Sequence, residues 1–203
     1  MQQAKFTRMQ DGDAEDYALI HALELDYAGS TVDRVLAGME ELKEGMQGYR
    51  VSRYEHSLQS ATRAWWDGAD IDWIVGALLH DIGDGMAPYN HDEYAALLIR
   101  PFVREQVSWC IEKHARFQLV YFGHFIGADP NKRDQFRDHP YYQDCVDFCA
   151  RWDQTSFDPG YETQPLDFFE PMVREVFARK PYDPATILSA VRIPLSASET
   201  ADG

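Results

Sequence analysis

The sequence predicts an all-α fold, and three observations support that prediction. Apolar residues recur at helical spacing in many segments, and capping residues precede several of them. Convincing alternating strands and hairpin turns are not apparent. The 203 residues, 45% of them hydrophobic, are enough for one domain with a sizeable core. We expect a single domain over residues 1–195 and a small, polar, disordered tail over residues 196–203.

Three helices are expected in the first third of the chain. Residues 16–27 and 32–44 have helical signals along their whole length. Ser52 and Glu55 match a capping box, in which two side chains satisfy free backbone N–H groups at the start of a helix. The third helix therefore begins there, runs to about residue 67 and carries His56 in its first turn.

Two shorter helices are expected next. Asp70 can cap the first of them, and the turn Gly83–Asp84–Gly85 would end it. The apolar face of this helix consists of Ile74, Ala77, Leu78 and Ile82. Asn90 and Glu93 stand in capping positions for a helix over residues 91–100.

Four helices complete the prediction. Pro101 and Pro140 would each open one, because proline suits the first turn of a helix. The apolar stripe of the helix after Pro101 is Val103, Val107, Cys110 and Ile111, and it continues to His114. The helix after Pro140 has Tyr141, Cys145, Phe148, Cys149 and Trp152 on one side. The last two helices are expected over residues 166–179 and 184–191.

Composition excludes several classes of partner. The formal net charge is −15, and no run of lysine or arginine offers the cationic face that nucleic acids require. No segment approaches the ~20 consecutive apolar residues of a membrane span, and the first residues lack a secretory pattern, so we expect a cytoplasmic protein. Three cysteines without a framework-like spacing argue against a disulfide scaffold. The sequence does not indicate an oligomeric state.

The strongest local signal for chemistry is the His80–Asp81 pair at the end of an apolar helix. Isolated charge in a core costs several kcal/mol unless it is paired or bound to a cation. His56 lies on the preceding helix, and two antiparallel helices of this length can bring it beside His80. Each histidine taken alone is more often a hydrogen-bonded structural residue, whereas the set is harder to explain in that way.

Three further residues extend this set. His114 completes an otherwise apolar stripe and should face the core, Asp153 lies at the inward edge of its helix, and His91 opens a short helix. Together the four histidines and two aspartates form a nitrogen and oxygen site without thiolate, which suits iron or manganese and disfavours a structural zinc site of the cysteine type. Histidines and carboxylates that converge from several helices are also how helical proteins build two-metal centres.

The ordered pattern of these six residues resembles the HD-domain superfamily, most of whose members are metal-dependent phosphohydrolases. Residues 54–59, 79–83 and 151–154 are similar to the branch of mixed-valent diiron oxygenases, and the resemblance spans roughly residues 46–159. It implies an HD-domain helical bundle with a dinuclear Fe(II)/Fe(III) site in its core and dioxygen as co-substrate. It also implies that His56, His80 and Asp153 hold one iron, that His91 and His114 hold the other, and that Asp81 bridges them.

The phosphonate-cleaving members of this branch suggest a small-molecule phosphonate substrate. Members that act on a primary amine have a tyrosine and a glutamate where this chain has Met46 and Tyr49. Aromatic faces bind trimethylammonium by cation–π attraction, which gives ~0.5–2 kcal/mol per contact. The resemblance therefore favours oxidation of (R)-1-hydroxy-2-(trimethylamino)ethylphosphonate to glycine betaine and phosphate over oxidation of 2-amino-1-hydroxyethylphosphonate to glycine and phosphate. Other aromatic candidates for a cage are Tyr27, Tyr54, Phe157 and Tyr161.

Two departures from the branch concern the phosphonate. Asp84 stands where those members have a histidine that helps to hold this group, and Gln118 stands where they have a lysine. Gln118 can still donate an amide hydrogen bond, but replacement cations must come from elsewhere. The nearest candidates in sequence are Lys113, Arg116, Lys132 and Arg133.

Two other functions are compatible with the same residues. A phosphohydrolase would use the metals to activate water, and dinuclear HD hydrolases exist. A degenerate HD domain that only binds or regulates is expected to lose one or more ligands, and none is lost here.

Overall fold

The computed structural model describes residues 2–188 and 193–195, which form helices and turns with no β-strand among them. The predicted all-α class is therefore confirmed. The α-helices are α1 (Ala14–Gly29), α2 (Thr31–Glu41), α3 (Arg53–Trp66), α4 (Ile71–Leu79), α5 (His91–Ile99), α6 (Glu105–Phe122), α7 (Tyr142–Phe148), α8 (Leu166–Phe177) and α9 (Pro184–Ile187). The expected tail over residues 196–203 and the end of the last expected helix lie outside the described residues.

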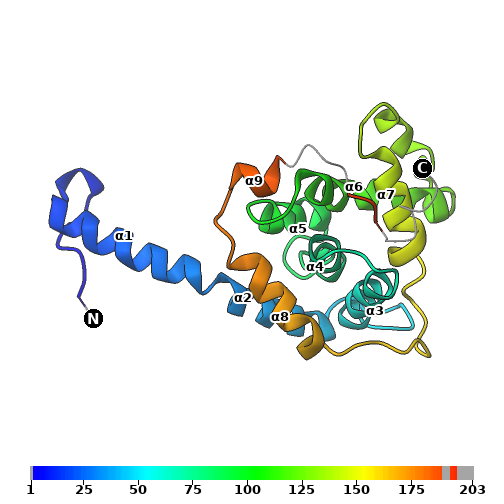
Figure 1. Ribbon diagram of the computed structural model, residues 1–203, viewed down its shortest axis with the longest axis horizontal. Helices are drawn as coiled ribbons and strands as arrows, with labels where there is room; N and C mark the ends of the chain where they lie inside the picture. Colours follow the sequence, from blue (N-terminus) through cyan, green and yellow to red (C-terminus); the bar gives the residue numbers. More distant parts are fainter. Residues whose placement is uncertain (1, 189–192, 196–203) are drawn as a thin grey trace.

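Helix α4 lies at the centre of the helical body, with α3, α6 and α8 packed around it (Figure 1). Every residue from Asp72 to Leu79 is buried, as expected for a helix that is apolar on nearly all sides. Gly76 allows α6 to approach closely, because a Cβ atom there would lie 2.7 Å from Val107 Cγ1. The next residue after α4 is His80, so the His80–Asp81 pair is delivered into the middle of the core.

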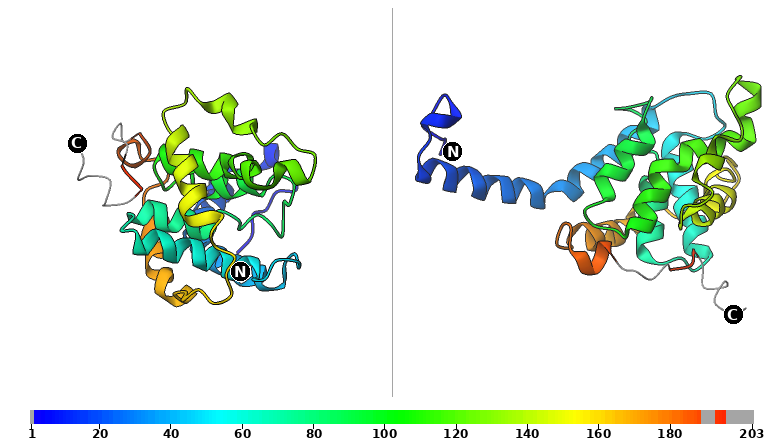
Figure 2. Two further views of the ribbon diagram at one scale, coloured as in Figure 1. Left: turned by 90° about the vertical axis from the view of Figure 1, so that its right-hand side faces the viewer. Right: turned by 90° about the horizontal axis from the view of Figure 1, so that it is seen from above.

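Helix α1 contrasts with this body. It projects away from the other helices as an arm (Figures 1 and 2), and Asp16 is its one buried residue. Leu23, Leu25 and Tyr27 on this helix are exposed. The arm lies outside the core cluster, so the residues that bear chemistry are positioned without it. No described helix combines the length and the apolar character that a membrane span needs.

The predicted helix starts are confirmed where side chains cap them. Ser52 Oγ accepts the Glu55 N–H at 3.1 Å, Glu55 accepts the Ser52 N–H at 2.7 Å, and Asp70 caps α4. The predicted start at Pro101 is wrong, because α6 begins at Glu105. The intervening turn is fixed from outside the segment: Asp72 accepts the Arg104 N–H at 3.0 Å.

Two more boundaries differ from the prediction. Helix α4 ends at Leu79 rather than at the glycines, and residues 80–86 form successive turns that carry Asp81. The helix predicted to open at Pro140 begins at Tyr142 and passes into a π-helix over Cys149–Asp153. Both differences lie beside residues of the predicted site, Asp81 and Asp153.

Candidate metal centre and the adjoining cavity

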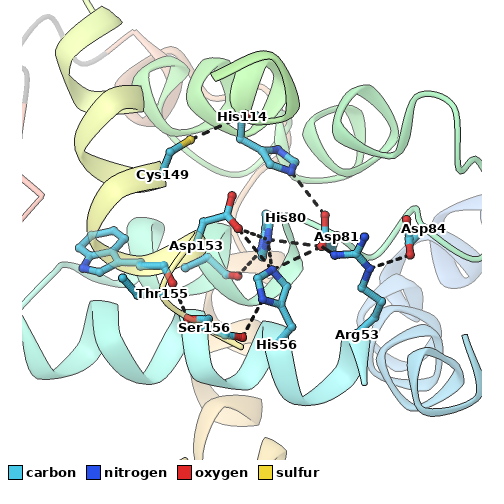
Figure 3. Close-up of polar contacts among 12 residues, drawn as sticks. Arg53, His56, His80, Asp81, Asp84, His114, Cys149, Asp153, Thr155 and Ser156 are labelled. Carbon is cyan, nitrogen blue, oxygen red and sulfur yellow. Dashed lines mark hydrogen bonds and ion pairs between the residues drawn. The ribbon is translucent and has the colours of Figure 1, made fainter. Parts of the chain in front are cut away.

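Six side chains from separate elements converge at the centre of the body, as Figure 3 shows for five of them. The six come from the first turn of α3, the end of α4 and the turn after it, the first residue of α5, the middle of α6 and the π-helix. They are His56, His80, Asp81, His91, His114 and Asp153. The structure therefore brings together every residue that was predicted to bind metal.

One oxygen of Asp81 faces the deepest part of this cluster. Asp81 Oδ2 lies 3.5 Å from His56 Nε2 and 3.6 Å from His80 Nε2, and these two nitrogens are 3.0 Å apart. Asp153 Oδ1 lies 3.3 Å from the first of these nitrogens and 3.7 Å from the second. We call His56, His80 and Asp153 the inner group.

The other oxygen of Asp81 faces a second pair of histidines. Asp81 Oδ1 lies 3.3 Å from His91 Nε2 and 3.4 Å from His114 Nε2. We call these two histidines the outer group. A carboxylate whose two oxygens point to two different groups of nitrogens has the arrangement of a bridging ligand.

Hydrogen bonds to main-chain carbonyls orient three of the histidines. The Nδ1 atoms of His56, His80 and His114 lie 2.9, 2.8 and 2.7 Å from the carbonyl oxygens of Ser156, Ala77 and Ile111, respectively. An Nδ1–H group that donates to a carbonyl leaves Nε2 with its lone pair, which is how metal-binding histidines are commonly fixed. The Nε2 atoms of His56 and His80 therefore face each other, and a cation between them would remove the repulsion between their lone pairs.

The electrostatics of the site also suit a cation. Burial raises the pKa of Asp81, but His80, His114 and Arg53 outweigh it and hold that pKa well below its usual range. Burial lowers the pKa of His56, yet the neighbouring carboxylates raise it overall.

In the other buried residues of the cluster, too, neighbouring charges outweigh the effect of burial on the pKa. The pKa of Asp153 is lowered by the nearby histidines against the effect of burial, and the pKa values of His80 and His114 are raised by the two carboxylates against the same effect. Asp153 Oδ2 is buried without a hydrogen-bond partner among the described residues. An unpaired buried carboxylate oxygen is costly unless it binds a cation, so the donor set fits a metal ion.

The π-helix is the local feature that aims Asp153. Its wider turn is closed by Gln154 N–H, which donates to the Cys149 carbonyl five residues earlier at 3.0 Å. Trp152 within the turn is anchored because its indole N–H donates to Asp67 at 2.7 Å. Short π-helical segments occur frequently at functional sites, and Ser156, whose carbonyl contacts His56, follows this one by three residues.

A cavity of about 390 Å³ opens beside the centre. Its described lining consists of Tyr49, Arg53, Asp81, His91, His114, Ala115, Gln118, Tyr121, Phe122, Asp153, Gln154 and Phe157. Phe157 stacks on His56 with ring centroids 4.3 Å apart and contacts Tyr49 at 4.9 Å. The cavity therefore joins the two groups of candidate metal ligands to an aromatic wall.

Some of the residues predicted to contact the substrate line the cavity, and others do not. Tyr49 and Gln118 line the cavity, whereas Met46 is 54% exposed and is not part of the described lining. Asp84 and Arg133 do not line it either, although Asp84 accepts a hydrogen bond from Arg53, which does. Of the further aromatic candidates, Phe157 reaches the cavity, and the described lining does not include Tyr27, Tyr54 or Tyr161.

Arg53 is the functional candidate that the sequence interpretation missed. The nearby Ser52 and Glu55 have the pattern of a capping box, which indicates a helix start and no role for Arg53. It stands three residues before His56, a spacing that places two side chains on the same face of a helix. That spacing was the available signal.

Comparison with known proteins finds a similarity to a domain family in part of the chain. Residues 53–143 match the HD domain. The match includes five of the six converging residues, and Asp153 follows it in the sequence.

A curated relative points in the same direction. The chain is 32% identical over 101 residues to a protein of Leisingera caerulea named [1-hydroxy-2-(trimethylamino)ethyl]phosphonate dioxygenase (glycine-betaine-forming). The alignment covers 44% of this chain and 48% of the relative, so it spans about half of each protein. The resemblance to the HD-domain phosphonate oxygenases that was found in the sequence is therefore supported by an independent comparison.

Proposed function

We propose that this protein is an iron-dependent oxygenase that cleaves the carbon–phosphorus bond of (R)-1-hydroxy-2-(trimethylamino)ethylphosphonate. The reaction would consume dioxygen and yield glycine betaine and inorganic phosphate. The proposal depends on one observation above all: the two oxygens of Asp81 face two separate groups of histidines at the edge of a cavity. A site of this kind can hold two cations side by side.

The six converging residues have distinct tasks in this proposal. The inner group of His56, His80 and Asp153 would hold one iron, the outer group of His91 and His114 would hold the other, and Asp81 would contact both. A mixed-valent iron pair would supply the activation of dioxygen, which protein side chains cannot provide themselves. The backbone carbonyls that fix Nδ1 of three histidines keep the Nε2 atoms aimed at the centre.

The cavity lining favours a quaternary amine over a primary one. A primary ammonium is best bound by a carboxylate that accepts its N–H groups, and the acidic side chains of the described lining are Asp81 and Asp153, both engaged at the centre. A trimethylammonium group has no N–H donor and binds to aromatic faces instead. The described lining supplies four aromatic rings, those of Tyr49, Tyr121, Phe122 and Phe157.

A phosphate-release assay with and without oxygen tests this function. The iron-loaded protein is given the trimethylated and the primary-amine hydroxyphosphonates, and iron, oxygen uptake and products are quantified. We expect phosphate and glycine betaine in equal amounts, in air and not under strict anaerobiosis, with a clear preference for the trimethylated substrate. Electron paramagnetic resonance should detect a coupled Fe(II)/Fe(III) pair.

The same assay separates the alternatives. A metal-dependent phosphohydrolase is the second candidate, because the HD domain and a pair of divalent ions would also activate water. Phosphate release from phosphate monoesters without oxygen would establish that function and reject the oxygenase. Preference for the primary amine, with glycine as product, would retain the oxygenase and reject the trimethylated substrate.

A further inference from the structure

An anionic substrate group needs a cation beside the metal centre, and the described cavity lining contains one side chain of the arginine or lysine type, Arg53. The basic residues considered from the sequence do not belong to this lining; they are Lys113, Arg116, Lys132 and Arg133. Two of these have acidic neighbours of their own, since Lys113 contacts Glu112 and Arg116 lies 3.6 Å from Glu93.

Arg53 is held in one orientation by contacts on three sides. Its Nε donates to Asp84 Oδ2 at 3.0 Å, and its Nη1 donates to Asp81 Oδ2 at 2.9 Å (Figure 3). Its Cζ lies 4.9 Å from the ring centroid of Tyr49, so one face of that ring supports the guanidinium. The Arg53 side chain is 14% exposed, and it lines the cavity.

The contacts leave most of the guanidinium free. Arginine has five N–H donors, and two are used by the aspartates. The other three, including both on Nη2, make no hydrogen bond to any residue that the structure describes. Arginine presents such donors as a planar fork that matches two oxygens of a phosphate or phosphonate.

We propose that Arg53 binds the phosphonate group of the substrate and that Asp84 is its positioning residue. The inference rests on the function proposed above and deepens it. Metal ions at the centre would share the charge of Asp81, which leaves Asp84 as the principal counter-ion of Arg53 and makes the guanidinium available to an anion. Related members have a histidine at position 84 that helps to hold the phosphonate. In this chain, Asp84 would instead hold the Arg53 guanidinium of α3 in place for that task.

Asp84 is well placed for this task. Its backbone N–H donates to the Asp81 carbonyl at 2.9 Å, so the turn that carries Asp81 also fixes Asp84. Its second oxygen lies 4.0 Å from Nδ1 of His91. The Asp84 carboxylate thus lies between the proposed phosphonate-binding residue and the outer group of histidines.

Anaerobic calorimetric titration of the metal-loaded protein tests the proposal. The ligands are the trimethylated hydroxyphosphonate, inorganic phosphate, and choline, which carries the ammonium and hydroxyl groups without a phosphonate. Arg53→Met should raise the Kd of the two phosphorus ligands about 10- to 100-fold, the loss expected for charged hydrogen bonds, with choline unaffected. Arg53→Lys should lose less, since it keeps the charge without the fork.

Asp84→Asn tests the positioning role separately. It keeps the charge of Arg53 but weakens the hold on Nε, so we expect a Kd increase of about 3- to 10-fold for the phosphorus ligands, appearing in turnover as a raised KM with a nearly constant kcat. Arg116→Met is the matched control, because it removes a similar charge outside the described lining, and it should change no Kd by more than about twofold. Circular dichroism and metal content verify each variant.

Unchanged phosphonate affinity in Arg53→Met, or equal weakening of choline, would overturn the proposal. If Arg53→Met does not fold or bind metal, Asp84→Asn decides, and wild-type phosphonate affinity in that variant would overturn it too. The titration involves no turnover, so its outcome is separate from the proposed function. Phosphonate binding that depends on Arg53 without oxygen uptake would contradict the oxygenase alone, whereas oxygen-dependent turnover with binding that ignores Arg53 would contradict this inference alone.

Discussion

The two sides of Asp81 differ in how firmly the protein holds them. On the inner side, His56, His80 and Asp153 have side chains that are at most 5% exposed, and carbonyl groups fix both histidines. On the outer side, the His91 side chain is 19% exposed, and its Nδ1 has no hydrogen-bond partner among the described residues. Both inner histidines are part of the folded core, and so is His114 of the outer group. The difference between the two sides therefore lies in His91, the more exposed ligand at the cavity.

This difference suggests a division of labour. A buried group of ligands with fixed orientations favours tight binding of a metal ion, because little order remains to be imposed. A more accessible group with one loosely held histidine leaves room for ligand exchange, which substrate and dioxygen require. We therefore expect the inner ion to support the structure and the outer ion to be the more easily exchanged one.

Asp81→Asn should have the largest effect, because it removes the carboxylate that contacts both groups. We expect loss of both metal ions and a fall in activity of at least about 1000-fold, with the helical fold retained since the amide has nearly the same shape. Metal analysis and circular dichroism check this. Asp92→Asn is a suitable control, since that buried carboxylate bonds locally to the Glu93 N–H. Full metal content in Asp81→Asn would contradict a bridging role.

Replacing one histidine in each group tests the division directly. His80→Ala should abolish metal binding at the inner group, weaken it at the outer group and cost about 2–4 kcal/mol of stability, because a fully buried side chain is lost. His91→Ala should lose one ion per chain and nearly all activity while its stability stays within about 1 kcal/mol of the wild type. Metal stoichiometry and denaturant unfolding measure both. Equal losses in the two variants would mean that the groups are not distinct.

The sequence predicted the fold class and the converging residues well because both depend on local patterns. Helical periodicity and the capping residues Ser52 and Asp70 are read along the chain, and the order of histidines and aspartates is a property of the sequence itself. The clearest sign of a site was the polar pair His80–Asp81 at the end of an apolar helix, and both residues are buried in the structure.

What the sequence did not reveal depends on contacts between distant segments. Helix α6 starts late because Asp72 binds the backbone of Arg104, and nothing near Pro101 encodes that contact. The π-helix that ends at Asp153 has no simple residue signature. The pairing of Arg53 with Asp84 joins residues 31 positions apart, so it became visible only when the turn after α4 was placed against the start of α3.

Metal binding should weaken as the pH falls. The raised pKa values of His56 and His80 in the inner group, and of His114 in the outer group, mean that these rings hold protons at higher pH than usual. A metal ion must displace those protons, so its affinity decreases about tenfold per pH unit for each proton displaced. Metal titrations between about pH 6 and pH 8 measure the slopes. A metal affinity that stays constant over this pH range would contradict proton displacement from these histidines.

Phe157→Leu should have the smallest effect. It tests whether this ring contacts the substrate or supports the inner group. The ring stacks on His56 of the inner group and contacts Tyr49 in the cavity wall. Leucine keeps an apolar contact with the imidazole, and the Ser156 carbonyl still fixes its Nδ1, so both metal ions should remain bound. The lost aromatic face should raise the KM for a trimethylammonium substrate about 2- to 10-fold, in line with one cation–π contact. If metal is lost instead, the ring supports the inner group rather than the substrate, and Phe157 belongs to the core rather than to the substrate-binding wall of the cavity.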